Sequence, residues 1–229
     1  MGPDLMKLKI DLHVHTNTSR DAFIDPKQLS TIVREKGIDG VAVTNHDTFT
    51  SVTASEAIVL PGIEVSTLQG HIIGLGISGP IDKGRTADET ISTIQDEGGI
   101  AIVPHPFDPV SPCVNPIKLR SRPDAIEVIN ADALFFGLNM KFAREMADRL
   151  DLPMVAGSDS HIPETVGDAY TLIDADSKNL GDILNAIRAG SVEPVGGPTR
   201  LSKKLLKMSR TLGRLAGRST PIGLDPTRG

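Results

Sequence analysis

Short apolar segments, each of a length suited to one buried strand, recur along the chain as far as residue 173. They are rich in Val and Ile and mostly lack polar alternation, which is typical of strands covered on both faces. The fold must therefore bury both faces of most of its strands. We expect the strands at residues 8–15, 40–44, 57–65, 71–77, 99–104, 125–129, 153–157 and 169–173.

Segments with helical features fall between several of these strands. Asp25, Pro26 and Gly37 are the residue types expected at the cap, the first position and the end of a helix. Thr86 and Glu89 form the pattern of a capping box. Two more helices are expected at residues 139–150 and 177–189. Strands that alternate with helices predict an α/β fold with a mostly parallel sheet, either a barrel or a doubly wound layer.

Charge divides the chain into an acidic body and a basic tail. The length of 229 residues suits one domain with an appendage, and we place the boundary between residues 1–198 and residues 199–229. Eight of the 24 basic residues lie in the tail, with only one acidic residue, Asp225. The body keeps 16 basic and 28 acidic residues. An acidic body suits a cation-binding site, and a basic tail suits an anionic partner.

The tail contains an amphipathic pattern at residues 201–216. Its large apolar residues repeat at helical spacing, and Lys and Arg occupy the other faces: Leu201, Leu205, Met208, Leu212 and Leu215 form the apolar set. We expect this helix to be followed by a disordered end, residues 217–229. Packing across the body is the first interpretation of the helix. Binding to nucleic acid or to an anionic membrane are the others.

Cysteine and hydropathy exclude several classes of protein. The single cysteine, Cys113, excludes an internal disulfide and a Cys-rich zinc site, which favours a reducing, cytoplasmic setting. No run approaches about 20 apolar residues, so no transmembrane helix is expected. No Gly-rich phosphate loop follows any strand, which counts against a nucleotide-cofactor fold.

The histidines fall at one kind of position. Five of the six lie at the carboxyl end of a predicted strand or directly after it, and His71 lies near the start of one. The five are His13, His15, His46, His105 and His161. In barrels the carboxyl ends of the strands form the face that carries the active site.

Two spacings indicate metal binding. Residues i and i+2 of a strand point to the same side, so His13 and His15 form a chelating pair, and Asp159 and His161 form a second pair. Glu64 lies in an apolar setting, where a charge is costly unless it is paired or metal-bound. Asp21 adds a carboxylate in the loop after the first strand. Imidazole and carboxylate ligands without thiolate suit Zn, Mn or Fe.

Taken together, these residues resemble the PHP family, named for polymerase and histidinol phosphatase. The motifs that carry the resemblance span residues 10–162: Asp11-Leu12-His13-Val14-His15-Thr16, Thr44-Asn45-His46-Asp47, Gly62-Ile63-Glu64-Val65-Ser66, His71, His105-Pro106 and Ser158-Asp159-Ser160-His161. The resemblance implies a distorted (β/α)7 barrel with two or three divalent ions.

The resemblance also implies three ligand sets. His13, His15, Glu64 and Asp159 would hold the first ion. Glu64 would bridge to a second ion, held also by His71 and His105. Asp21, His46 and His161 would hold the third. A water bridging the first two ions is the expected nucleophile.

Several residues have more than one interpretation. Asp47 or His161 would assist proton transfer, although Asp47 would equally orient an imidazole ligand. Asp25 is an alternative to Asp21, but a helix cap explains it better. Asn45 stands where relatives often have Asp, and Asn130 is a candidate for the rim of the site. We interpret Cys113 as an incidental thiol.

The expected activity is hydrolysis of a phosphate ester: a nucleotide, a short oligonucleotide or a small phosphomonoester. The first alternative is an amidohydrolase-like enzyme for C–N bonds, because such enzymes also use a His-x-His pair. The second is a non-catalytic, metal-stabilised module that binds nucleic acid through the basic tail.

Overall fold

The computed structural model describes residues 5–217, and within them nine strands form a single sheet. All eight predicted strands are present. The strands are β1 (Met6–Val14), β2 (Gly40–Val43), β3 (Ile58–Ser66), β4 (His71–Leu75), β5 (Ile100–Val103), β6 (Ala125–Asn130), β7 (Met154–Gly157), β8 (Ala169–Ala175) and β9 (Val192–Gly196). The helices are α1 (Leu29–Lys36), α2 (Ala87–Asp96), α3 (Phe136–Leu150), α4 (Leu180–Arg188) and α5 (Leu201–Leu215).

The sheet is mixed, and the prediction of a mostly parallel sheet is wrong. Its order is β7-β6-β5-β4-β3-β2-β1-β8-β9. The neighbours among β1, β2 and β3, and those among β5, β6 and β7, pair in parallel, but β4 and β8 are antiparallel to both of their neighbours. The connection between β3 and β4, residues 67–70, is too short for a parallel crossover and forces a hairpin. Strict alternation of strands and helices also fails, since no helix separates β2 from β3.

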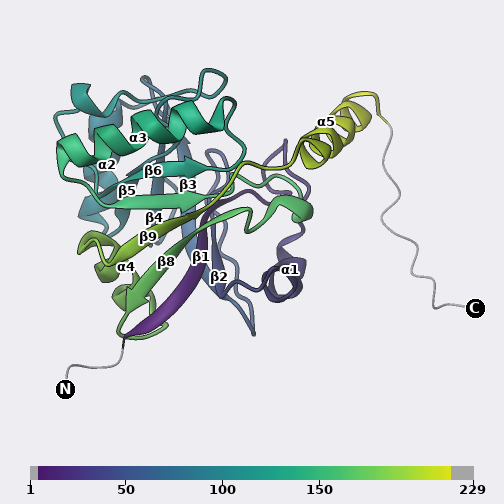
Figure 1. Ribbon diagram of the computed structural model, residues 1–229, viewed down its shortest axis with the longest axis horizontal. Coiled ribbons are helices and arrows are strands. Elements are labelled where there is room, and N and C mark those ends of the chain that lie inside the picture. Colours follow the sequence, from purple (N-terminus) through teal and green to yellow (C-terminus); the bar gives the residue numbers. More distant parts are fainter. Residues whose placement is uncertain (1–4, 218–229) are drawn as a thin grey trace, which may run out of the picture. The chain divides into compact units, whose positions relative to one another are not determined.

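The sheet curls into a barrel that is nearly closed, because the end of β7 returns to β1 (Figure 1). The His15 N–H donates to Ser160 O at 2.8 Å just beyond the two strands. Thr171 Oγ1, on β8, donates to Ala156 O at 3.0 Å and accepts from Ala156 N at 2.9 Å. The first bond links the end of β1 to the segment after β7, and the other two link β7 to β8.

Local chemistry explains the helix ends. The Asp25 carboxylate accepts the Lys27 N–H at 2.9 Å in a short 3-10 turn that leads into α1, and Gly37 ends α1 with φ 65°. Both bonds of the predicted capping box, between Thr86 and Glu89, are present at the start of α2. The start of α3 is three residues earlier than predicted, at Phe136, because it has no side-chain cap to mark it.

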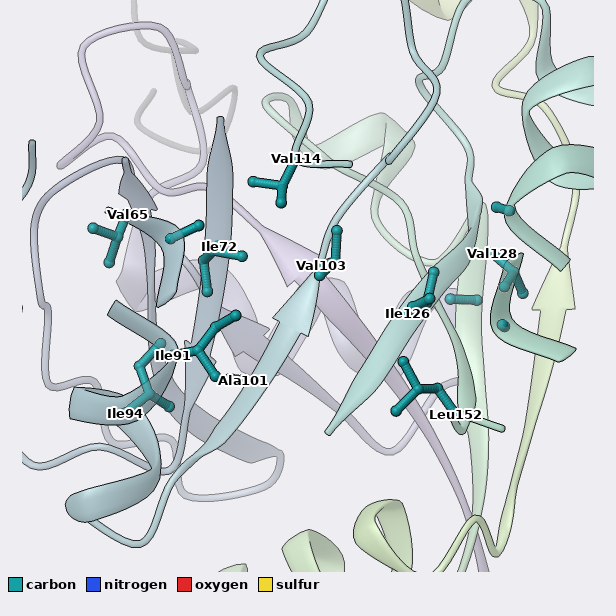
Figure 2. Close-up of a cluster of buried hydrophobic side chains, with 14 of the residues drawn as sticks. Val65, Ile72, Ile91, Ile94, Ala101, Val103, Val114, Ile126, Val128 and Leu152 are labelled. Atoms are coloured by element: carbon teal, nitrogen blue, oxygen red, sulfur yellow. The ribbon is translucent and has the colours of Figure 1, made fainter. Parts of the chain in front are cut away.

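Buried aliphatic side chains fill the space between the sheet and the helices. Figure 2 shows Ile91 and Ile94 of α2 beside Ile72 of β4, and the cluster continues to Ile126 and Val128 of β6. α2 contacts β4 and β5, and α3 contacts β6. α2 and α3 thus cover the outer face of β4, β5 and β6.

The described residues divide into two compact units, residues 5–199 and residues 200–217. The second unit contains α5, which spans almost the whole predicted amphipathic segment. The predicted disordered end falls on residues 218–229, outside the described residues. Within residues 5–217, no helix has both the length and the apolar character needed to cross a membrane.

Candidate metal centre

The carboxylate of Glu64 lies at the middle of a group of imidazoles. Glu64 stands near the carboxyl end of β3 and is 1% exposed. Its Oε2 is 3.3 Å from His13 Nε2, 3.3 Å from His15 Nε2 and 3.0 Å from His46 Nδ1. β1 supplies His13, His15 follows that strand directly, and a parallel bridge from residue 46 to residue 64 places His46 beside them. One oxygen of Glu64 thus faces three imidazoles from two neighbouring strands.

The second oxygen of Glu64 faces two more imidazoles. Its Oε1 is 2.8 Å from His71 Nδ1 and 3.1 Å from His105 Nε2. His71 begins β4, and because β4 is antiparallel to β3, its first residue pairs with Ser66 at the carboxyl end of β3. His71 is the one histidine that begins a strand, yet it lies at the same end of the barrel as the other five. The two oxygens of Glu64 thus face different imidazoles.

Asp159 adds a carboxylate from the loop after β7. Its Oδ1 is 3.5 Å from His13 Nε2, 3.3 Å from His15 Nε2 and 3.6 Å from His161 Nδ1. Together with Glu64, it places two carboxylate oxygens against the His13 and His15 pair. The four side chains predicted for the first ion therefore lie together.

Asp21 lies beside the last two imidazoles. Its Oδ2 is 3.2 Å from His161 Nε2 and 3.6 Å from His46 Nε2. The alternative residue, Asp25, instead caps the turn before α1. The structure thus brings all nine predicted ligands to one end of the barrel: His13, His15, Asp21, His46, Glu64, His71, His105, Asp159 and His161.

The donor atoms have the separations and the unmet hydrogen bonds of a metal site. Ligand atoms bound at about 2.1 Å stand about 3.0–3.4 Å apart in octahedral or tetrahedral sites, close to the distances around Glu64. His13 Nε2, both nitrogens of His15, Glu64 Oε2 and His71 Nδ1 are buried and without a hydrogen bond in the described chain. Such buried polar atoms are costly unless a cation satisfies them. The donor set therefore fits divalent ions.

Four groups of three donors lie within 4.8 Å of one another among the described residues. They are His13, His15 and Asp159; His13, Glu64 and His105; His46, Glu64 and His71; and His15, His46 and His161. Because the groups share members, the site is one continuous cluster.

Charges inside the cluster shift its titration strongly. Burial lowers the pKa of His13, but the carboxylates of Asp159, Glu127 and Glu64 outweigh burial and raise that pKa well above its usual value. Burial raises the pKa of Glu64, yet the surrounding imidazoles, first His13 and then His105, hold it well below its usual value. Burial lowers the pKa of His15 to about 3, assisted by the charge of His161. A neutral His15 is ready to act as a ligand.

Comparison with known proteins points to one family. A family model described as PHP-associated matches residues 138–192. The chain is 33% identical over 141 residues to the uncharacterized protein MJ1587 of Methanocaldococcus jannaschii, in an alignment covering 54% of this chain and 82% of the relative. The fold also matches a two-domain protein of Bacteroides vulgatus that contains a predicted PHP-like metal-dependent phosphoesterase, with a TM-score of 0.66 and 18% identity over 86% of this chain and 68% of that chain. The chain belongs to the PHP family.

A second solved structure shares the fold of this chain over nearly its whole length. It is the lesion-specific endonuclease PfuEndoQ from Pyrococcus furiosus, which matches with a TM-score of 0.66 at 12% identity. The match covers 97% of the PHP chain and 74% of the endonuclease. At 12% identity, this similarity is evidence of a shared fold and of nothing more.

Glu127 is a residue of the PHP site that the sequence analysis missed. Its Oε1 is 3.0 Å from His13 Nδ1, and its Oε2 accepts from His105 N at 3.0 Å and from Asn130 Nδ2 at 2.9 Å. Glu127 is 3% exposed, in the middle of β6. A carboxylate on the second nitrogen of an imidazole sets its tautomer and orientation toward a metal. Glu127 therefore aims His13 Nε2 at Glu64.

Gly157 makes the contact between β1 and β6 possible. A Cβ at this position would lie 2.6 Å from Glu127 Oε1 and still closer to His13 Cβ. Any side chain there would push His13 and Glu127 apart. The glycine at the end of β7 is thus required by the site beside it.

Asn45 and Asp47 flank His46 but support backbone rather than imidazoles. Asn45 Oδ1 accepts from Thr16 N at 2.7 Å, which holds the loop after β1. The Asp47 carboxylate accepts from Ser66 N at 2.7 Å and from Ser66 Oγ at 3.0 Å. Among the described residues, no imidazole forms a hydrogen bond with the Asp47 carboxylate. The interpretation that Asp47 orients an imidazole ligand therefore has no hydrogen bond to support it.

Asn130 and Cys113 lie behind the ligands. Asn130 Nδ2 is 3.3 Å from Asp159 Oδ2 as well as bonded to Glu127, so this residue supports the site from β6. Cys113 Sγ lies 4.0 Å from His105 Nδ1 and donates to His105 O at 2.9 Å. The thiol interpreted as incidental is thus adjacent to a candidate ligand.

Backbone strain is concentrated at the site. Of the five non-glycine residues with positive φ in the described chain, three belong to it: Asp47 with φ 51°, His105 with φ 31° and Asp159 with φ 53°. This conformation costs on the order of 1–2 kcal/mol per residue. Such strain is retained where the surrounding contacts outweigh it, which is common at functional sites.

Proposed function

We propose that this PHP chain is a metal-dependent phosphoesterase. The observation that carries the proposal is the Glu64 carboxylate, buried between five imidazoles with one of its oxygens unbonded. A buried group of this kind has too few hydrogen-bond partners to be purely structural. Two or three divalent ions, Mn, Zn or Fe, would satisfy it.

The proposed ligand sets are the ones that the family resemblance implies. His13, His15, Glu64 and Asp159 would hold the first ion, and Glu64 would bridge to a second ion held by His71 and His105. The third set, Asp21, His46 and His161, is more open, since the Asp21 side chain is 48% exposed. We infer that the third ion is the most readily exchanged.

When bound, the ions would lower the pKa of a water ligand and neutralise the oxygens of a phosphate. Glu127 would hold His13, and Asn130 would hold Asp159, so that neither ligand rotates during turnover. His161 is the better candidate for moving a proton to the leaving alkoxide, because the carboxylate of Asp47 is occupied by Ser66.

The substrate class is a phosphate ester, either a nucleotide, a short oligonucleotide or a small phosphomonoester. Support comes from membership of the PHP family and from the fold shared with a lesion-specific endonuclease. Hydrolysis of C–N bonds is less well supported, because the Asp21, His46 and His161 set beside the Glu64 cluster suits a phosphate with several oxygens to neutralise.

The test is turnover of p-nitrophenyl phosphate and of its diester with added Mn, Zn or Fe, against a panel of cyclic amides. His13→Ala and Asp159→Ala should each reduce turnover to the background rate while the circular dichroism spectrum is kept. The matched control is Glu145→Ala on the exposed face of α3. Unchanged turnover of either site variant in metal-replete protein would refute the proposal.

A further inference from the structure

Asp11 is a fully buried carboxylate beside the metal centre that belongs to none of the proposed ligand sets. It lies on β1, two residues before His13. Its Oδ1 accepts from His13 N at 3.3 Å and from Ser158 N at 2.9 Å, and its Oδ2 accepts from Ser158 Oγ at 2.5 Å and from Gly167 N at 2.9 Å. A carboxylate has about four lone pairs that can accept hydrogen bonds. The four donors therefore occupy the Asp11 carboxylate, which makes it a support of the site rather than a metal ligand.

Both neighbours of Asp159 in the chain are tied to β1 or to the residue directly after it. Ser158 is held by Asp11 through two groups, its backbone N–H and its hydroxyl. On the other side, Ser160 O accepts from His15 N at 2.8 Å. The hydroxyls of the two serines are also hydrogen-bonded to each other, and both serines are fully buried. Asp159 thus lies between two fixed residues.

The backbone of Asp159 has a conformation that a free chain would avoid. Its φ is 53°, in the left-handed region, which is unfavourable for a residue that has a Cβ. Such a conformation persists only where the surrounding contacts enforce it. It brings Asp159 Oδ1 to 3.5 Å from His13 Nε2 and to 3.3 Å from His15 Nε2. Asn130 contacts the other oxygen of this carboxylate, whereas the bonds to Ser158 act on the backbone.

We propose that Asp11 is a positioning residue of the metal centre. By fixing Ser158 to β1, it holds Asp159 in the left-handed conformation that makes its carboxylate a ligand of the first ion. The inference rests on the metal centre proposed above. Asp11 also binds Gly167, in the turn before β8, so one carboxylate holds both ends of the connection between β7 and β8 against β1.

A purely structural role makes a different prediction. If Asp11 only stabilised the barrel, its loss would leave metal affinity unchanged, or would weaken it to the same degree whether or not the Asp159 carboxylate is present. If Asp11 acts through Asp159, its loss has no further effect on metal affinity once that carboxylate is gone. A double-mutant cycle distinguishes the two roles.

The experiment is a calorimetric titration of the metal-free full chain with Mn or Zn. Asp11→Asn places an amide NH2 against at least one of the four donors, so the variant loses part of the support. We expect its metal affinity to fall by about 10–100-fold, as for other residues that orient a ligand. In the Asp159→Ala background, the same substitution should change the affinity by no more than about twofold.

A milder variant covers the case in which Asp11→Asn does not fold, as judged by circular dichroism. Ser158→Ala removes the hydroxyl bond to Asp11 and keeps the backbone N–H bond. Its loss of affinity should be smaller and should also disappear in the Asp159→Ala background. The matched control is Asp124→Asn, which should bind metal like the wild type. The Asp124 carboxylate is largely buried and accepts from Ala101 N at 2.8 Å, but it lies before β6, at the opposite end of the barrel.

Two results would overturn the role of Asp11 alone. One is wild-type metal affinity in Ser158→Ala and in any folded Asp11→Asn. The other is a loss of affinity that is equal with and without the Asp159 carboxylate, which would assign Asp11 to the stability of the barrel. A wild-type chain that bound neither Mn nor Zn is a different outcome, since it would refute the metal centre itself and the inference with it.

Discussion

At the scale of single residues, Glu127 controls the site without being one of its proposed ligands. Glu127→Gln keeps the shape and the oxygen that accepts from His105 N, but it removes the charge beside His13 Nδ1. Loss of such a supporting carboxylate lowers metal affinity by about 10–100-fold. We expect that loss in a titration with Mn or Zn, with the circular dichroism spectrum of the metal-free protein unchanged. The control is Glu145→Gln, which should bind metal normally.

Glu127 also shows what the sequence can and cannot provide. The ligands themselves were predictable, because His-x-His, Asp-x-His and an acid in an apolar run each carry a recognisable spacing. Glu127 lies in Ala-Ile-Glu-Val-Ile-Asn, an acid in an apolar strand like Glu64, and the same reasoning would have identified it. Its partner was not predictable, since His13 is 114 residues away and meets it only because Gly157 leaves room.

His105 gives the metal-free protein a dependence on pH. Burial lowers its pKa, but hydrogen bonds with Cys113 and Glu64 and the charge of Asp159 raise it to about 10, above the unfolded value of about 6.5. The protonated imidazole therefore stabilises the fold fully below about pH 6.5, and that contribution is lost as pH rises toward about 10. In chelator, the difference in melting temperature between wild type and His105→Gln should shrink over this interval. A difference in melting temperature that stays constant over this pH interval would contradict the raised pKa of His105.

At the scale of elements, α2 depends on its capping box. Thr86→Ala removes the bond from Glu89 N to Thr86 Oγ1 and should reduce the free energy of unfolding by about 1 kcal/mol. The control is Thr93→Ala within the same helix, which should cost little because Ala has the higher helix propensity. Urea unfolding measures both. If both variants lost the same free energy of unfolding, the cap would not stabilise α2.

The elements that the sequence did not predict lack such local signals. β9 is an edge strand, Val192–Gly196, with Pro194 in its middle and no buried residue, so neither composition nor periodicity marks it. α3 begins after Phe135, which has the left-handed conformation and makes no side-chain cap. In both places tertiary contacts decide the structure. Where a cap is present, as at Asp25 and Thr86, sequence and structure agree.

At the scale of the whole molecule, closure of the barrel positions the site. Thr171→Val keeps the volume but leaves Ala156 N and Ala156 O without the Oγ1 partner that joins β7 to β8. A buried group left unbonded costs about 1–3 kcal/mol. Ile173→Val on the same strand is the control for lost packing alone, at about 0.5–1.5 kcal/mol. We expect Thr171→Val to lower metal affinity as well, because β7 leads into Asp159, whereas Ile173→Val should not.

Metal removal tests the molecule as a unit, because the ligands come from β1, β3, β4 and the segments after β1, β2, β5 and β7. Ions bound there would link segments from His13 to His161, and they would bind only the folded chain. Free metal at 100 times its dissociation constant should therefore stabilise the fold by about 2.7 kcal/mol, seen as a higher melting temperature with Mn or Zn than with chelator. Glu64→Gln should lose most of this increase, since every predicted ion but the third depends on that carboxylate. If the wild type melted at one temperature in both conditions, the clustered imidazoles would not be holding metal.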